Sequence, residues 1–381
     1  MITTVDTKYE ANKLRKEGHY EEALPIYREL WEKSDDQYIA AGLLHCLRKL
    51  ELFDDAIPLA DNLFAREPEL PWCHFEITWT YIQGIIEKAD NNENLEKILN
   101  VAERVIKLNA GDIARKIVVL RVLKLASSSK QWDVINEWAP RINPESLSTD
   151  PKIIDGKTGW SDQAQWYNYR IKGLIHGSEQ SEVKEAVVLA ETAAERFPRQ
   201  QKYFQRYKAL ANSISGDLPA AEIILQSLCK GDRPDWWLLH DYSKVISSQG
   251  RKDDALRIMY QAAKACPSHK LTVSLLEDIG VICLELEKHE ESRSHLLLCK
   301  YIREKERWHV SESVISKIAN INGIIGIEHE PSSLQDALVV CQNYWDVECN
   351  KTADSDEKKL RERKIRRGLI GSLILTPDDK P

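Results

Sequence analysis

A six-residue phrase that occurs twice constrains the fold of this chain more than any other feature. It reads Gly-His-Tyr-Glu-Glu-Ala at 18–23 and Gly-Arg-Lys-Asp-Asp-Ala at 250–255. Weaker copies keep a small residue at the last position: Ala56, Ala186 and Ala221. The steps from Ala23 to Ala56, from Ala186 to Ala221 and from Ala221 to Ala255 are 33, 35 and 34 residues. A period near 34 residues is typical of helix–turn–helix units that stack into an array, which offers an extended surface rather than one pocket.

The clearest single unit is the segment 236–267. Apolar residues recur at helical spacing up to Gly250, and glycine commonly ends a helix. Asp253 and Asp254 then lie in the first turn of a second helix, where acidic side chains are favoured by the helix dipole. A proline that stops the pair falls twelve residues after the small residue in three units: Pro68, Pro198 and Pro267. The sequence therefore predicts two helices per unit and a proline at the end of the unit.

These residues resemble the tetratricopeptide repeat family, in which a small residue packs between the helices of a pair and an aromatic residue follows four positions later. Tyr27 follows Ala23 in this way, and Ala262 and Pro267 match later small and proline positions of the family. The resemblance is good over 4–37 and 236–267, fair over 38–70, 202–232 and 273–305, and weak over 72–110 and 113–147. It implies an all-α fold, a right-handed α-solenoid of eight to nine helix pairs.

The chain divides into helix pairs as follows: 4–34, 38–68, 72–109, 112–143, 161–198, 201–230, 235–267, 271–305, and a ninth at 309–322 and 332–349. A polar loop with two prolines and two glycines fills 144–160. We expect this loop to be a hinge between an N-terminal sub-array, 1–143, and a C-terminal sub-array, 161–349. Residues 350–381 are expected to form a charged linker and the start of a further domain.

The C-terminal residues differ in character from the array. The run 350–367 is highly charged, and 368–381 reads as an apolar strand followed by a turn. Because a lone strand is not stable, the strand either pairs within the array or belongs to a longer protein, and the second interpretation is favoured. The segment from Gly368 is weakly similar to the first strand of an S1 or cold-shock barrel. Bacterial conflict-system proteins that join such repeats to an S1-like domain are the nearest family of that kind.

Composition and charge exclude several classes of protein. Hydrophobic residues form 43% of the chain, too many for wholesale disorder. A net charge of −7 indicates no general attraction to nucleic acid or to an anionic membrane. No apolar run approaches the roughly 18 residues of a membrane span, and the first ten residues are polar, unlike a secretion signal. We therefore expect a cytoplasmic protein with no membrane partner; the sequence leaves its oligomeric state open.

No catalytic or metal-binding constellation is recognisable. The chain lacks the common nucleotide, hydrolase and metalloprotease motifs. Its eight cysteines form no C-x-x-C pair, so free thiols in a reducing compartment are expected. His295 and Cys299, four residues apart, could in principle clamp a metal, but a half-exposed histidine beside a buried thiol is the favoured interpretation. We expect no cofactor, no metal and no enzymatic activity, and a scaffold or adaptor that binds a protein or peptide in the groove of the array.

Candidate groove residues lie on the first helix of several pairs. The register from Ala23 points Lys8, Asn12 and Arg15 into the groove of the first pair. Lys8 and Asn12 match the first two positions of the clamp with which chaperone-binding members of the family hold a C-terminal carboxylate. The other three clamp positions hold unsuitable residues: Gly42, Thr80 and Gly84. Binding of a chaperone C-terminus is therefore rejected.

A second set of groove candidates combines aromatic and basic side chains: Arg170, Tyr203, Arg206, Tyr207, His240 and Lys244. Such a mixture suits an acidic or aromatic peptide, or stacked bases. Packing between repeats is the favoured interpretation for Tyr203 and Tyr207. Neighbouring residues on a helix diverge by about 100°, so we expect one of Trp236 and Trp237 to be exposed or at a seam between repeats.

The alternative function is a nucleic-acid-associated adaptor with an S1-like or cold-shock-like domain beyond residue 381. It rests on basic residues that could contact phosphates: Lys359, Arg361, Arg363, Lys364, Arg366 and Arg367. A solvated helix leading into the next domain is the favoured interpretation of this run.

Overall fold

The computed structural model describes residues 4–90, 94–177, 180–231, 233–326, 331 and 333–347. Contacts divide the chain into two compact units, residues 1–207 and 208–381. Within the described residues, helices account for nearly the whole structure, and one two-stranded hairpin is the exception. The predicted all-α fold is therefore confirmed.

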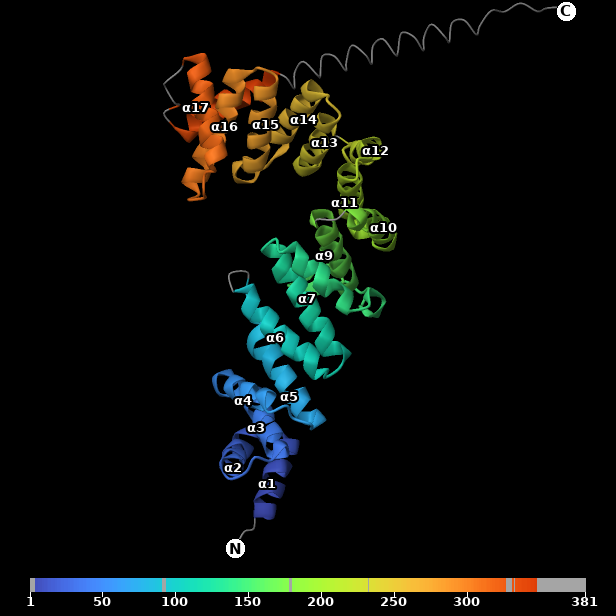
Figure 1. Cartoon of the computed structure of the whole chain (residues 1–381), viewed down its shortest axis with the longest axis vertical. Helices are drawn as coiled ribbons and strands as arrows, with labels where there is room; N and C mark the ends of the chain where they lie inside the picture. The colour runs from blue at the N-terminus through green and yellow to red at the C-terminus, as the bar shows by residue number, and fades with distance from the viewer. Residues whose placement is uncertain are drawn as a thin grey trace, which may run out of the picture. The chain divides into compact units, whose positions relative to one another are not determined.

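Helices follow one another as consecutive pairs in each unit (Figure 1). The first unit holds α1 (Thr4–Glu17), α2 (Tyr20–Glu32), α3 (Gln37–Lys49), α4 (Phe53–Ala65), α5 (Pro71–Tyr81), α6 (Leu95–Leu108), α7 (Asp112–Ser128), α8 (Trp132–Trp138), α9 (Asp162–His176) and α10 (Gln180–Arg196). The second unit holds α12 (Leu218–Leu228), α13 (Trp236–Ser248), α14 (Lys252–Ala265), α15 (Val273–Glu285), α16 (His289–Lys305) and α17 (Glu312–Ile325). The division falls within α11 (Gln201–Ile214). These bounds follow the predicted pairs closely.

The recurring phrase corresponds to one turn geometry between the two helices of a pair. Gly18 and Gly250 have φ values of 87° and 81°, in the left-handed region that glycine adopts without strain. The residue five positions later is fully buried in both pairs, at Ala23 and Ala255. Elsewhere a larger residue adopts the same left-handed conformation five positions before the equivalent site: Glu51, Lys130 and Glu287. The turn therefore recurs in pairs whose sequence no longer shows the glycine.

Small buried residues let the two helices of a pair approach closely. The alanines that define the period have no exposed surface: Ala23, Ala56, Ala186, Ala221 and Ala255. Within the first unit, α3 contacts both α1 and α5, so the first helices of successive pairs lie side by side. This arrangement builds a continuous face from helices far apart in the sequence.

Gly42 of α3 is crowded by the preceding helix. A Cβ atom there would lie 2.3 Å from Cε1 of Tyr27, whose ring is fully buried. Gly42→Ala should lower the free energy of unfolding by about 1–3 kcal/mol, because the ring must move. Gly323→Ala in α17 is the matched control, since a Cβ there meets nothing within 4 Å. The control should be neutral or stabilising by up to about 1 kcal/mol. Urea unfolding of both variants measures the difference, and equal effects would contradict the packing described.

The loop at 144–160 lies within the first unit rather than at the division between units. It contains a hairpin, β1 (Ile153–Ile154) paired antiparallel with β2 (Lys157–Thr158). Asp155 and Gly156 form its turn, with φ values of 50° and 72°, as a two-residue hairpin turn requires. The backbone N–H of Gln163 in α9 donates to the Ser148 carbonyl, 3.1 Å away. The loop is thus tied to the following helix, and the hinge stays a prediction.

The third pair is longer than the others because α5 continues into a π-helical segment, η1 (Ile82–Ile86). The predicted insertion near 89–94 falls partly at residues 91–93, which lie outside the described residues. A π-helical turn takes an extra residue, and such segments are frequent at functional sites. The segment places Gln83 at the end of the face described below.

The helical residues 334–347 close the described part of the second unit. Their buried side chains join the core of α13–α16: Ala337, Leu338, Cys341 and Trp345. The other half of the predicted ninth pair, α17, packs on α16 through a separate cluster that contains Leu296 and Ile318. The two segments therefore contribute to different parts of the core.

His295 of α16 is wholly buried, which corrects the expectation that it is half-exposed. Its Nδ1 lies 2.7 Å from the Glu291 carbonyl oxygen, and its Nε2 lies 2.9 Å from Nε1 of Trp345. Because an indole nitrogen only donates, Nε2 accepts and Nδ1 carries the proton. Burial lowers the pKa of His295 to about 4. Cys299 has its Sγ 3.6 Å from the Val273 carbonyl, so neither residue faces the other as a metal ligand.

Candidate binding face on the first helices of the first unit

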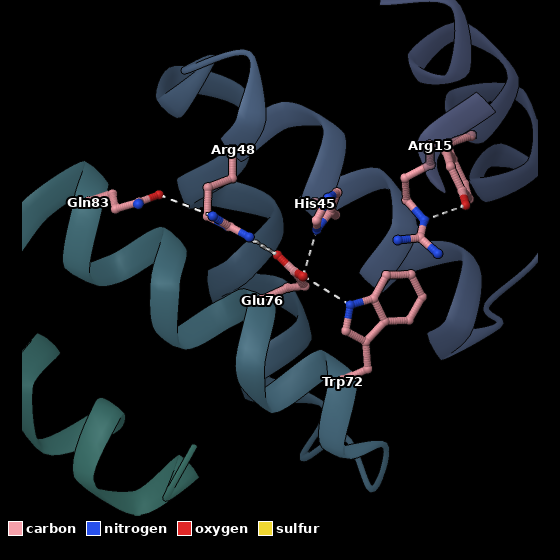
Figure 2. A network of polar contacts seen from close by, with 7 residues as sticks. Arg15, His45, Arg48, Trp72, Glu76 and Gln83 are labelled. Atoms are coloured by element: carbon pink, nitrogen blue, oxygen red, sulfur yellow. Dashed lines mark hydrogen bonds and ion pairs between the residues drawn. The ribbon is translucent and has the colours of Figure 1, made fainter. Parts of the chain in front are cut away.

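The face formed by α1, α3 and α5, here called the N-terminal face, gathers polar and aromatic side chains into one network (Figure 2). Its centre is the carboxylate of Glu76, in the middle of α5 and 1% exposed. Oε2 of Glu76 accepts from Nε and Nη2 of Arg48 at 3.0 and 2.8 Å. Oε1 accepts from Nε1 of Trp72 at 2.9 Å and lies 2.8 Å from Nδ1 of His45. Two helices therefore supply all the partners of one buried charge.

Glu76 is held in its ionised form. Burial by itself opposes ionisation. The hydrogen bond from His45 and the charge and hydrogen bonds of Arg48 outweigh burial, so the pKa of Glu76 lies below its usual value. Because an ionised carboxylate only accepts hydrogen bonds, Nδ1 of His45 carries the proton in this contact. Arg48 also donates from Nη1 to Oε1 of Gln83 at 3.3 Å, which extends the network to the π-helical segment.

Arg15 of α1 forms the other end of the network. Its Nε donates to the Tyr27 hydroxyl at 3.2 Å, and that hydroxyl donates to Oδ1 of Asn12 at 2.8 Å. The guanidinium lies over the ring of Trp72, 4.5 Å from its centre. Figure 2 shows the two terminal nitrogens of Arg15 with no bond to the residues drawn. Arg15 is therefore held in one orientation by Tyr27 and Trp72.

The edge of the N-terminal face is formed by Lys8, Asp36 and Tyr38. Lys8 Nζ lies 2.5 Å from Oδ2 of Asp36 and 5.0 Å from the centre of the Tyr38 ring. Asp36 also caps α3, because its Oδ1 accepts from the Tyr38 backbone N–H at 2.8 Å. The Tyr38 ring meets Trp72 edge to face, with ring centres 4.9 Å apart. The half-buried aromatic pair is thus positioned by contacts from two helices.

The structure places Lys8, Asn12 and Arg15 together on this face, but two of them are engaged within the chain. Lys8 is paired with Asp36, and Asn12 accepts from Tyr27. The Tyr27 ring also occupies the space beside Gly42, so an asparagine side chain could not fit there without a rearrangement. These contacts give a physical reason for the missing chaperone clamp.

Sequence reasoning missed the centre of the network: His45, Arg48, Trp72, Glu76 and Gln83. One signal was available, since Glu76 interrupts an apolar helical stretch, and a charge in such a position is buried only with a partner. Its partners lie 28 and 31 residues earlier in the sequence, and only the packing of α3 against α5 identifies them.

Arg170 and Tyr207 of the second predicted set are engaged inside the first unit. Arg170 donates to Oδ1 of Asn136 at 3.1 Å and pairs with Glu185 at 3.1 Å. Tyr207 is 6% exposed, and its hydroxyl donates to Oδ1 of Asn168 at 2.9 Å. Both side chains therefore already have partners within the chain, and a bound peptide would have to share or replace these contacts.

Tyr203 and Arg206 are the remaining members of this set on α11. Tyr203 is 43% exposed and lies beside Trp160, with ring centres 5.7 Å apart. Arg206 is partly buried, and its guanidinium lies 5.8 Å from the centre of the Tyr207 ring.

His240 and Lys244 in the second unit share one carboxylate. Nε2 of His240 and Nζ of Lys244 lie 2.7 and 3.0 Å from Oδ2 of Asp278 in α15. Burial opposes ionisation of Asp278, but the His240 hydrogen bond and the Lys244 charge outweigh it and lower its pKa. The second unit therefore repeats the chemistry of Glu76, with a histidine and a cation from one first helix on a carboxylate from the next.

Trp236 and Trp237 are both partly buried, so neither is the fully exposed residue that the sequence allowed. They line a surface pocket of about 720 Å³ between the start of α13 and the end of α14.

The predicted nucleic-acid contacts at 359–367 and the strand at 368–381 lie outside the described residues.

The described residues can also be compared with the predictions about membrane spans, metal sites and cysteines. None of the described helices is long and apolar enough to cross a membrane. Nor do the described residues bring three or more histidine, cysteine, aspartate or glutamate side chains together as a metal site would need. Seven described cysteines are free thiols, and burial raises the pKa of Cys46 and Cys283 to about 12, which keeps both protonated.

Comparisons with known proteins find similarity at the level of solved structures. No family model and no curated protein matches the chain. It is similar to a tetratricopeptide repeat protein from Parabacteroides merdae, with 11% identity and a TM-score of 0.33 over 71% of this chain and 96% of that chain. A thermophilic tetratricopeptide repeat protein of Thermus thermophilus matches at 14% identity and a TM-score of 0.24, over 74% of this chain and 100% of that one.

A third similar structure is that of Naa15/Naa10 bound to HypK-THB. It matches at 14% identity and a TM-score of 0.34, over 84% of this chain and 52% of that chain.

Proposed function

We propose that this protein is a non-catalytic scaffold of the cytoplasm that binds a protein partner through an extended segment of that partner. The observation that carries the proposal is the N-terminal face. There Arg15, Tyr38 and Trp72 are partly exposed, yet hydrogen bonds and ring contacts hold them in place. Side chains ordered before binding lose less entropy when a partner binds, which is the property that a recognition surface needs.

The chemistry of the face favours binding over catalysis. Its buried carboxylate, Glu76, is held ionised by Arg48 and His45, so it is not poised to exchange a proton near neutral pH. What remains for a partner is the aromatic pair of Tyr38 and Trp72, the Arg15 guanidinium and the edge residues around Tyr38. Tyrosine, tryptophan and arginine are the side chains most enriched where protein partners bind. The alternative of a nucleic-acid adaptor rests on residues outside the described ranges, and no described contact on this face favours it.

Selection of peptides from a random display library against the whole chain tests the proposal. We expect enriched peptides to lose about tenfold or more in affinity for Tyr38→Ala and Arg15→Gln, since each change removes a contact at an ordered site. Tyr9→Ala and Lys16→Gln are matched controls on α1, because both side chains are exposed and neither lies in the network. We expect the controls to bind like the wild type. Failure to enrich any peptide, or equal losses for controls and face variants, would contradict the proposal.

A further inference from the structure

Three cationic side chains and one histidine gather on the first unit away from the N-terminal face. Lys172 and His176 lie one turn apart on α9, Lys130 lies in the turn between α7 and α8, and Arg206 lies on α11. Lys172 Nζ and the Arg206 guanidinium each lie 5.8 Å from the centre of the same Tyr207 ring. Two helices far apart in the sequence therefore bring positive charge to the same ring, and the charge of Lys130 acts on His176.

Three members of this cluster, Lys130, Lys172 and His176, have no ion pair with a carboxylate of the described residues. Burial, followed by the charge of Arg206, lowers the pKa of Lys172. Burial, followed by the charges of Lys172, Lys130 and Arg206, lowers the pKa of His176. In the described part of the chain, these three residues form no ion pair with a carboxylate, whereas many other cations of the unit do. A partly buried lysine beside like charges costs stability unless an anion is bound.

The surroundings hold the cluster in a defined geometry. Tyr207 is anchored by its hydrogen bond to Asn168. The His176 ring is stacked on Trp132, the first residue of α8, with ring centres 4.5 Å apart and an interplanar angle of 25°. Lys172 and Arg206 therefore lie beside a fixed ring, and His176 is held by a second ring.

We propose that Lys130, Lys172, His176 and Arg206 form an oxyanion site that binds the carboxylate or phosphate group of an acidic peptide segment. This inference rests on the proposed function, because it assigns the anion to a bound peptide. A peptide is favoured over a nucleic acid because the rings at the site are already engaged. Tyr207 is buried and Trp132 is stacked on His176, so neither offers a free face to a base.

Inorganic phosphate is the first probe, and it tests the site without any peptide. The NMR titration of the His176 ring in the whole chain should show a higher pKa in millimolar phosphate than in chloride, because a bound anion stabilises the imidazolium. Lys172→Met should abolish most of this difference, whereas Lys124→Gln, which removes an exposed cation of α7, should leave it unchanged. An equal His176 titration in phosphate and in chloride would overturn the site.

Short labelled peptides of one sequence, carrying glutamate, phosphoserine or glutamine at the same positions, identify the source of the anion. We expect the glutamate or phosphoserine peptide to bind, and the glutamine peptide to bind about tenfold more weakly, the value of one charge-assisted hydrogen bond. Lys172→Met should remove that preference and Lys124→Gln should retain it. An oligothymidylate that binds more tightly than either peptide, with the same dependence on Lys172, would overturn the peptide assignment.

The outcomes separate this site from the proposed function. Peptides that need Tyr38 and Arg15 but bind equally with glutamate or glutamine would leave the scaffold proposal intact and overturn the acidic-peptide site. A phosphate-dependent His176 titration without any enriched peptide would support the anion site and contradict the peptide scaffold.

Discussion

Glu76→Ala is expected to lower the free energy of unfolding of the first unit by about 3–5 kcal/mol. The substitution leaves the Arg48 guanidinium, 7% exposed, without its carboxylate partner. It also removes the acceptor of the Trp72 indole and the partner of His45. A buried cation without a partner is the main cost, and it exceeds the loss of any single hydrogen bond. Urea unfolding followed by tryptophan fluorescence measures the change.

The double variant Glu76→Leu, Arg48→Met is the matched control. Both charges are then absent, and apolar side chains of similar size fill the site. Replacing a whole buried ion pair in this way is often neutral or stabilising. We therefore expect the double variant to be more stable than Glu76→Ala by several kcal/mol, on the order of the single-variant loss. If the double variant were as unstable as Glu76→Ala, the unpaired charge would not be the cause.

Acid is expected to destabilise the second unit through His295. The folded pKa is about 4, and the unfolded value is about 6.5. As the pH falls below about 6.5, the unfolded chain therefore takes up a proton that the folded chain excludes. The neutral, buried imidazole contributes fully to the free energy of unfolding above pH ~6.5, and this contribution is lost progressively as the pH falls to ~4. The total loss is about 3 kcal/mol, at roughly 1.4 kcal/mol for each pKa unit.

His295→Phe isolates this contribution because the ring no longer titrates. Around His295 the structure places the Glu291 carbonyl, the rings of Tyr260 and Tyr344, and the Trp345 indole. The variant should be less stable at pH 7, since the indole N–H loses its acceptor, yet it should lose less stability between pH 6.5 and 4. Thermal unfolding of both proteins across that range measures the slopes. Identical slopes would show that His295 is not the group responsible.

The helix pairs could be predicted because their signals are local. A turn glycine, a small residue five positions later and a terminal proline lie within one pair, so they can be recognised without knowing what the pair contacts. The Asp155-Gly156 hairpin carried an equally local signal that was overlooked, since an Asp-Gly pair favours a two-residue turn. Glu51 and Glu287 could not be recognised as turn residues, because glutamate rarely adopts the left-handed conformation.

The candidate sites were less accessible from the sequence. Arg15 and Arg206 were identified from the helical register alone, and the structure shows each beside a ring that positions it. The pairing of Lys8 with Asp36 could not be predicted, and neither could the approach of Lys172 and Arg206 to the same ring. Both depend on which residues a neighbouring helix presents, and a periodic pattern does not record that.

The sequence by itself determined the period, the bounds of most helices and the all-α fold, since each follows from residues within a few turns of one another. The tertiary structure alone decided that Glu76 is a paired and buried charge, that His295 is neutral in the core, and that Lys172 and Arg206 meet beside Tyr207. The physical reason is the same in each case. Burial and charge pairing are properties of helices brought together by packing: Arg48 lies 28 positions from Glu76, and Trp345 lies 50 positions from His295.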